Sequence, residues 1–87
     1  MIPIQDLLNR IRWDKEFGRG QFEIGFLDRV EDRIIKVPFS AIRFPAGEHF
    51  SFQVANESDE EISIPLHRVR KVWKDGILIW QRKGGDP

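Results

Sequence analysis

The chain has 87 residues, no cysteine, and equal numbers of basic and acidic side chains, fourteen of each. This length is typical of one small domain, and the absence of cysteine excludes disulfides and thiolate metal sites. A hydrophobic content of 40%, with seven Phe and three Trp, argues against a disordered chain. The sequence contains no apolar run long enough to span a bilayer and no signal peptide, so we expect a soluble, cytoplasmic protein without membrane contact.

The formal net charge of zero hides an uneven distribution. Residues 1–66 carry a net charge of −4, whereas residues 67–83 contain six Lys or Arg and only Asp75, a net charge of +5. A whole-protein argument for nucleic-acid binding therefore fails, but a local argument holds for the C-terminal segment. With only His49 and His67 available, a zinc site would need carboxylates, and we expect neither a metal nor another cofactor.

The N-terminal segment predicts a short helix from Pro3 to Ile11. Apolar residues recur at helical spacing from Ile4 onwards, and a proline suits the first turn, where a missing N–H costs nothing. The following segment, 13–20, contains two glycines and mixed charges. It predicts a loop, in which Asp14 is placed to cap the next segment.

Alternation of apolar and polar residues predicts two antiparallel strand pairs in the middle of the chain. The first pair joins residues 21–28 to 33–37, and the second joins 48–54 to 61–66. Phe50 is expected to share one face of its strand with the next two apolar residues of the alternation, Phe52 and Val54. Prolines at the ends of the second and fourth segments place those strands at sheet edges or at strand ends.

The last segment, 67–82, predicts a β-hairpin closed by a two-residue turn at Asp75-Gly76. An unbroken hairpin with this turn places Val72 opposite Ile79 and Lys71 opposite Trp80. One face is expected to belong to the core, and it carries Val72, Ile77 and Ile79. The opposite face would remain partly open, and it carries Lys71, Trp73 and Trp80.

Together these elements predict an α+β fold, in which one N-terminal helix packs on a curved antiparallel sheet of about six strands. The sheet is expected to be open or to curl into a partly closed barrel, with the helix covering one face or end. Residues 1–83 form the single predicted domain, and residues 84–87 a frayed tail.

Aromatic rings beside cations are typical of surfaces that bind single-stranded nucleic acid, because bases stack on the rings and the cations neutralise phosphates. Other interpretations stay open at this point. Tryptophans in small sheets are commonly part of the core, and the acidic run 57–61 is placed to neutralise the basic segment. His67 alone is more typical of a surface histidine than of a catalyst. The sequence contains no phosphate-binding glycine loop, no HExxH zinc motif and no nucleophile elbow.

Five short motifs follow one another along the chain. They are Ile11-Arg12-Trp13-Asp14, then Phe22-Glu23-Ile24-Gly25-Phe26-Leu27-Asp28-Arg29, then Val37-Pro38-Phe39, then Ile64-Pro65-Leu66-His67-Arg68-Val69-Arg70, and finally Asp75-Gly76 with Ile79-Trp80-Gln81-Arg82. In this order they resemble the small archaeal family described as the RNA cyclic group end recognition domain. The resemblance covers nearly the whole chain.

The resemblance implies binding of RNA ends that carry a 2′,3′-cyclic phosphate, a role proposed for this largely uncharacterised family mainly from its fusion to RNA-processing domains. The polar positions of this chain that match the family motifs are Asp28, Arg29, His67, Arg68, Arg70 and Arg82. The chain departs from the family pattern at Phe26, where a tyrosine is expected, and this removes one hydroxyl group. The family has no established catalytic residues, so none are carried over to this chain. The basic and aromatic hairpin and the resemblance together favour a non-catalytic RNA-binding module.

The predicted site combines residues that match the family with the basic and aromatic residues of the hairpin. It consists of Arg29, His67, Arg68, Arg70, Lys71, Trp73, Trp80 and Arg82. An arginine fork matches the two free oxygens of a cyclic phosphate, and an indole ring can stack on the terminal base. The expected partner is therefore a single-stranded RNA end.

Two alternative functions stay open. In the first, His67 serves as the general acid or base of a phosphodiesterase or nuclease. In the second, exposed strand edges make the domain a protein-interaction or oligomerisation module, with a second copy or an RNA-processing protein as its partner.

Overall fold

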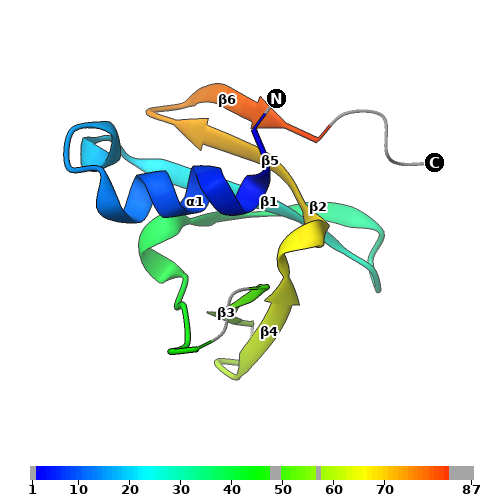
Figure 1. The fold of residues 1–87 in the computed structure, drawn as a ribbon. Helices are drawn as coiled ribbons and strands as arrows, with labels where there is room; N and C mark the ends of the chain where they lie inside the picture. Colours follow the sequence, from blue (N-terminus) through cyan, green and yellow to red (C-terminus); the bar gives the residue numbers. More distant parts are fainter. Residues whose placement is uncertain (1, 48–49, 57, 83–87) are drawn as a thin grey trace.

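A computed structural model describes residues 2–47, 50–56 and 58–82. One α-helix and six strands follow one another in these residues (Figure 1). They are α1 (Ile4–Trp13), β1 (Phe22–Asp28), β2 (Arg33–Pro38), β3 (Ser51–Ala55), β4 (Glu61–Pro65), β5 (Val69–Lys74) and β6 (Ile77–Gln81). Three short 3₁₀ helices lie between them, namely η1 (Phe17–Arg19), η2 (Phe39–Ala41) and η3 (Leu66–Arg68). The predicted α+β class is confirmed, and the predicted tail, 84–87, lies outside the described residues.

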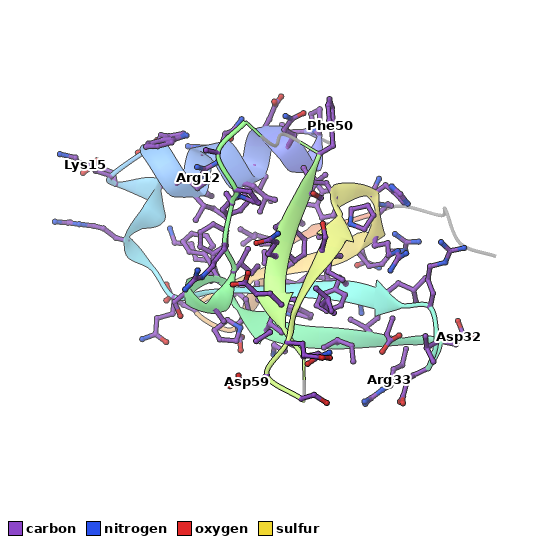
Figure 2. The ribbon with its side chains drawn as sticks, turned by 90° about the horizontal axis from the view of Figure 1, so that it is seen from below. Arg12, Lys15, Asp32, Arg33, Phe50 and Asp59 are labelled. Carbon is purple, nitrogen blue, oxygen red and sulfur yellow. The ribbon has the colours of Figure 1, made fainter. Side chains whose placement is uncertain are left out.

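The strands form two antiparallel sheets and no closed barrel. Four strands pair in the order β2-β1-β5-β6, and β3 pairs with β4 in a separate sheet. The chain leaves β2 at Pro38, which cannot donate a ladder hydrogen bond, and it turns through η2. As a result, the outer edge of β2 has no ladder partner in the described ranges. Seen from below, β3 and β4 cross over β1 and β2 (Figure 2).

A single hydrophobic core fills the space between these layers. The helix contributes the predicted apolar stripe, whose four members from Ile4 to Ile11 are all buried. Phe26 of β1 packs edge-on against Phe52 of β3, with 6.0 Å between the ring centroids. Side-chain packing of this kind, rather than strand pairing, therefore holds the two sheets together.

The end of α1 is fixed by Asp14, as the sequence predicts. One oxygen of its carboxylate accepts hydrogen bonds from the amides of Phe17 (3.1 Å) and Glu16 (3.0 Å), which start η1. The hydrogen bond from Phe17 is the main reason why the pKa of Asp14 lies below its ordinary value, and the Arg10 guanidinium adds to this effect. No helix in the described ranges is long and apolar enough to cross a membrane.

The second strand pair is shorter at its start than predicted. Strand β3 begins at Ser51, and residues 48 and 49 of the predicted strand lie outside the described residues. The prediction for Phe50 is wrong, because 72% of this residue is exposed while Phe52 is fully buried. Phe50 precedes the first ladder pair, Ser51 with Pro65, so the alternation of the strand does not extend to it.

The turn of the last hairpin is confirmed. Asp75 and Gly76 both have positive φ angles, 52° and 84°, as a tight two-residue hairpin turn requires. The first two predicted pairs, Lys74 with Ile77 and Trp73 with Leu78, are confirmed, but the predicted register from Val72 onward is wrong. Val72 pairs with Trp80, because Ile79 forms a bulge in β6. A second bulge lies in β5, where Val69 and Lys71 pair with consecutive residues of β1 and Arg70 between them has no partner in that strand.

The bulges change which side chains enter the core. Trp80 faces inward beside Val72 and is only 7% exposed, so the prediction that it lies on an open surface is wrong. Its indole nitrogen donates a hydrogen bond to the carbonyl oxygen of Ile2 at 2.8 Å. The predicted core residues Ile77 and Ile79 are instead exposed, by 68% and 39%.

Candidate nucleic-acid interface

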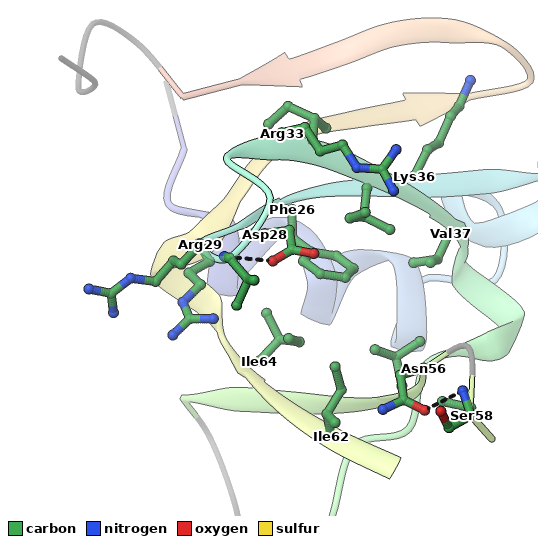
Figure 3. Close-up of a pocket in the computed structure, with 16 residues that line it drawn as sticks. Phe26, Asp28, Arg29, Arg33, Lys36, Val37, Asn56, Ser58, Ile62 and Ile64 are labelled. Atoms are coloured by element: carbon green, nitrogen blue, oxygen red, sulfur yellow. Dashed lines mark hydrogen bonds between the residues drawn. The ribbon is translucent and has the colours of Figure 1, made fainter. Parts of the chain in front are cut away.

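A groove of about 890 Å³ runs between the open edge of β2 and the β3–β4 pair (Figure 3). Phe26 from β1 lies in its centre, and Ile62 and Ile64 from β4 face it from the opposite wall (Figure 3). Apolar residues line both walls, because β3 and β4 pack on the core without closing the ladder to β2, and polar residues such as Arg33, Asn56 and Ser58 lie between them. The groove is the size of a typical small-molecule site and can admit a planar ring.

Two arginines at this groove keep their charges unpaired. Arg29, in the turn after β1, and Arg68, in η3, both line the groove. Neither guanidinium group forms an ion pair with another described residue. The Nε atom of Arg68 is shielded from solvent and has no hydrogen-bond partner among the described residues. A buried donor of this kind is costly unless a ligand satisfies it, which makes Arg68 a strong candidate for contact with an anion.

The turn that carries Arg29 is built by Asp28. The Asp28 carboxylate accepts hydrogen bonds from the amides of Val30 (2.9 Å) and Glu31 (3.3 Å), so the intervening Arg29 side chain projects from the tip. Arg33 lies at the same end of the molecule (Figure 2) and pairs with Glu31 at 3.0 Å. Asp28 is thus occupied by its own turn and does not form an ion pair with Arg29.

The two remaining arginines of the predicted site, Arg70 and Arg82, donate hydrogen bonds to backbone carbonyls in and beside η3. Arg70 donates to the carbonyl of His67 at 2.6 Å. The Arg82 guanidinium donates to the carbonyls of Val69 (3.0 Å) and Leu66 (3.4 Å). Burial lowers the pKa of Arg82, and the charge of Arg70 adds to this shift. These two arginines therefore hold η3 in place.

Trp73 and Lys71 lie on the outer face of the four-stranded sheet, away from the groove. The outer face is defined by the β1 residues Glu23 and Gly25, which alternate with the inward-facing Phe22, Ile24 and Phe26. Trp73 pairs with Glu23, and Lys71 pairs with Gly25. The ammonium of Lys36, on β2, lies 4.5 Å from the centroid of the Trp73 ring and 3.4 Å from the Glu23 carboxylate.

The predicted site residues thus lie in four places. Arg29 and Arg68 line the groove; the surface around η3 carries His67, Arg70 and Arg82; the outer face carries Lys71 and Trp73; and Trp80 lies in the core. Trp80 belongs to the core and offers no free ring face to a base. His67 is exposed, and the second histidine, His49, lies outside the described residues.

Sequence reasoning missed the apolar walls of the groove and the role of Lys36. Nothing in a single strand shows that Ile62 will face Phe26, because the two strands are not neighbours in a sheet. The alternative in which the acidic run 57–61 neutralises the basic segment does not hold for Glu61. Glu61 pairs with Arg43 at 3.3 Å. Glu57 lies outside the described residues.

The fold and the groove define a small α+β domain with a basic-rimmed apolar cleft. Residues 1–82 match the family described as the MJ1316 RNA cyclic group end recognition domain, and the chain therefore belongs to this family. A UPF0248 protein of Saccharolobus islandicus is 30% identical over 84 residues, which cover 93% of this chain and all of that protein. A UPF0248 protein of Saccharolobus solfataricus is 29% identical and is covered over 98% of its length. One of Metallosphaera sedula is 27% identical, with 94% covered. No solved structure matches the chain significantly.

Proposed function

We propose that the protein is a non-catalytic RNA-binding module whose groove receives the end of a strand that carries a 2′,3′-cyclic phosphate. The observation that carries this proposal is a pair of guanidinium groups, those of Arg29 and Arg68, that form no ion pair with another described residue and lie at a largely apolar cleft. The description of the family supports RNA as the ligand. The narrower assignment to a cyclic phosphate rests on the chemistry of the groove.

A cyclic phosphate suits this groove because it combines one negative charge with a compact ring. Its two free oxygens match the paired donors of an arginine fork, and the Nε–H of Arg68 would gain the partner that it lacks. The terminal base would lie on Ile62, which is 37% exposed and lines the groove. A doubly charged terminal phosphate lacks the fused ring, so it would fill the groove less completely.

Binding of matched oligonucleotides tests the proposal. RNA ending in a 2′,3′-cyclic phosphate is expected to bind tighter than the same RNA ending in a 3′-hydroxyl, with an affinity that falls as salt rises. Arg68→Gln is expected to cost about 1.5–3 kcal/mol, or about 10- to 150-fold in affinity, since it removes a charged donor. Lys15→Gln is the matched control, because it removes one charge beyond the far end of α1 (Figure 2).

The result that would overturn the proposal is equal binding of both RNA ends, or no binding of either at low salt. Analysis of the recovered RNA distinguishes the enzymatic alternative in the same experiment. If the pure protein opens the cyclic phosphate, and His67→Ala abolishes this reaction, the domain is an enzyme and not a non-catalytic binding module.

A further inference from the structure

We propose that the outer face of the four-stranded sheet holds the stretch of RNA that leads into the groove, with a base stacked on Trp73. We call this surface the Trp73 platform and define it as the outward side chains of Trp73, Lys36, Lys71, Leu78 and Ile34. The inference rests on the proposed function, because it follows the same strand away from its end. It adds a second contact region, on the opposite side of the sheet.

The position of the Trp73 ring is fixed by a glycine. A Cβ atom added at Gly25 would lie 3.0 Å from two atoms of the six-membered ring of Trp73 and 2.9 Å from a methyl group of Ile34. The indole therefore lies against the backbone of β1, in space that any larger residue would fill. A ring held in this way loses little freedom when a base stacks on it, which favours binding.

Lys36 connects the platform to the groove. It lies on β2, the edge strand that separates the two regions, and it lines the groove while its ammonium lies over the Trp73 ring. Its ion pair with Glu23 at 3.4 Å is exposed, and exposed pairs of this kind contribute little free energy. An RNA phosphate that crosses the edge of β2 can therefore replace the Glu23 carboxylate at low cost. It would draw the Lys36 ammonium away from the ring and free that ring face for a base.

The surroundings of Trp73 suit a polynucleotide. Lys71, on the neighbouring β5 position that faces outward, supplies a second cation for the backbone phosphates. Leu78, directly opposite Trp73, is 43% exposed and extends the apolar surface on which a sugar or base can lie. Within the described residues no helix or strand covers this face of the sheet. Alternating apolar and cationic groups along one path are what single-stranded RNA requires.

Fluorine NMR on the whole chain labelled with 5-fluorotryptophan can follow the platform directly. The three tryptophans give three resonances, which Trp13→Phe and Trp73→Phe assign. An RNA of about six nucleotides that ends in a cyclic phosphate is expected to shift the Trp73 resonance. A single nucleoside 2′,3′-cyclic phosphate is expected to bind the groove and leave that resonance in place.

Affinity provides the second readout. Trp73→Leu is expected to weaken the longer RNA by about 5- to 160-fold, the range known for stacking of one base on an aromatic side chain, and to leave the single nucleotide unaffected. The unaffected nucleotide also shows that the variant is folded. Trp13→Leu is the control, because Trp13 is also an indole beside a cation, Arg12, but it lies at the end of α1 and is 71% exposed, whereas Trp73 is partly buried. It is expected to change neither affinity.

Several outcomes would overturn the inference. Binding of the longer RNA that is no tighter than that of the single nucleotide would overturn it, and so would binding that leaves the Trp73 resonance in place. A Trp73 resonance that moves with protein concentration before RNA is added would show that a second copy of the chain covers the platform. A different result would separate the two proposals. If the longer RNA binds and shifts the Trp73 resonance equally well with a cyclic phosphate or a hydroxyl at its end, and the single nucleotide does not bind, the platform is supported and recognition of the RNA end is contradicted.

Discussion

Asp75 and Gln21 are joined by two reciprocal hydrogen bonds. The amide of Gln21 donates to the Asp75 carboxylate at 2.8 Å, and the amide of Asp75 donates to the Gln21 carbonyl at 2.7 Å. These contacts connect the turn of the β5–β6 hairpin to the residue that precedes β1. Asp75, whose positive φ the hairpin turn requires, thus also holds the residue at which the chain enters β1.

We expect Asp75→Ala to lower the free energy of unfolding by about 1–3 kcal/mol, because the Gln21 amide loses its acceptor and alanine disfavours a positive φ. Urea unfolding measures this change. Asp59→Ala is the control, since Asp59 also has a positive φ, 66°, while its carboxylate accepts no hydrogen bond from the described residues. An equal loss in the two variants would mean that the Asp75 carboxylate contributes nothing.

Trp80→Phe should lower the free energy of unfolding by about 1–3 kcal/mol. The substitution removes the hydrogen bond to the Ile2 carbonyl and leaves part of a buried site unfilled. Guanidinium titration followed by circular dichroism gives the value. If the indole of Trp80 is quenched by acrylamide as readily as that of Trp13 in the native protein, its burial is contradicted.

Gly25→Ala is expected to destabilise the fold by about 1–3 kcal/mol, because the new methyl group would overlap the Trp73 ring and Ile34. A double-mutant cycle with Trp73→Leu tests this cause. The cost of the alanine should fall when the ring is absent, whereas additive effects of the two substitutions would exclude a contact between them.

The lowered pKa of Asp14 predicts how stability depends on pH. A carboxylate whose pKa is lower in the folded state stabilises the fold above its unfolded pKa, and this contribution is lost as the pH falls through the folded value. Asp14→Asn should therefore be less stable than the natural chain at neutral pH, and the two should converge below pH of about 4. Thermal melts at several pH values measure the difference, and a constant gap down to acidic pH would contradict the assignment.

The elements that could be predicted from the sequence are those with local causes. The apolar stripe that starts at Ile4 forms its helix, the Asp75-Gly76 turn forms its hairpin, and Asp14 caps η1. Each depends on residues that are close in the sequence. Family membership was also predictable, because the motifs retain their order along the chain.

The features that could not be predicted depend on packing between distant segments. The bulge at Ile79 brings Trp80 inward, where its indole meets the carbonyl of Ile2, a residue 78 positions earlier. No periodicity within the hairpin indicates that such a partner exists. The groove has the same origin, since its walls at Phe26 and Ile62 come from different sheets.

The contact between Ile2 and Trp80 also determines how the domain can be joined to other proteins. Because these residues touch, the polypeptide enters and leaves the fold at adjacent points. An affinity tag or fused partner would therefore approach from one side, whichever terminus carries it. Immobilising the protein through either terminus should consequently present the same surface to a dissolved oligonucleotide.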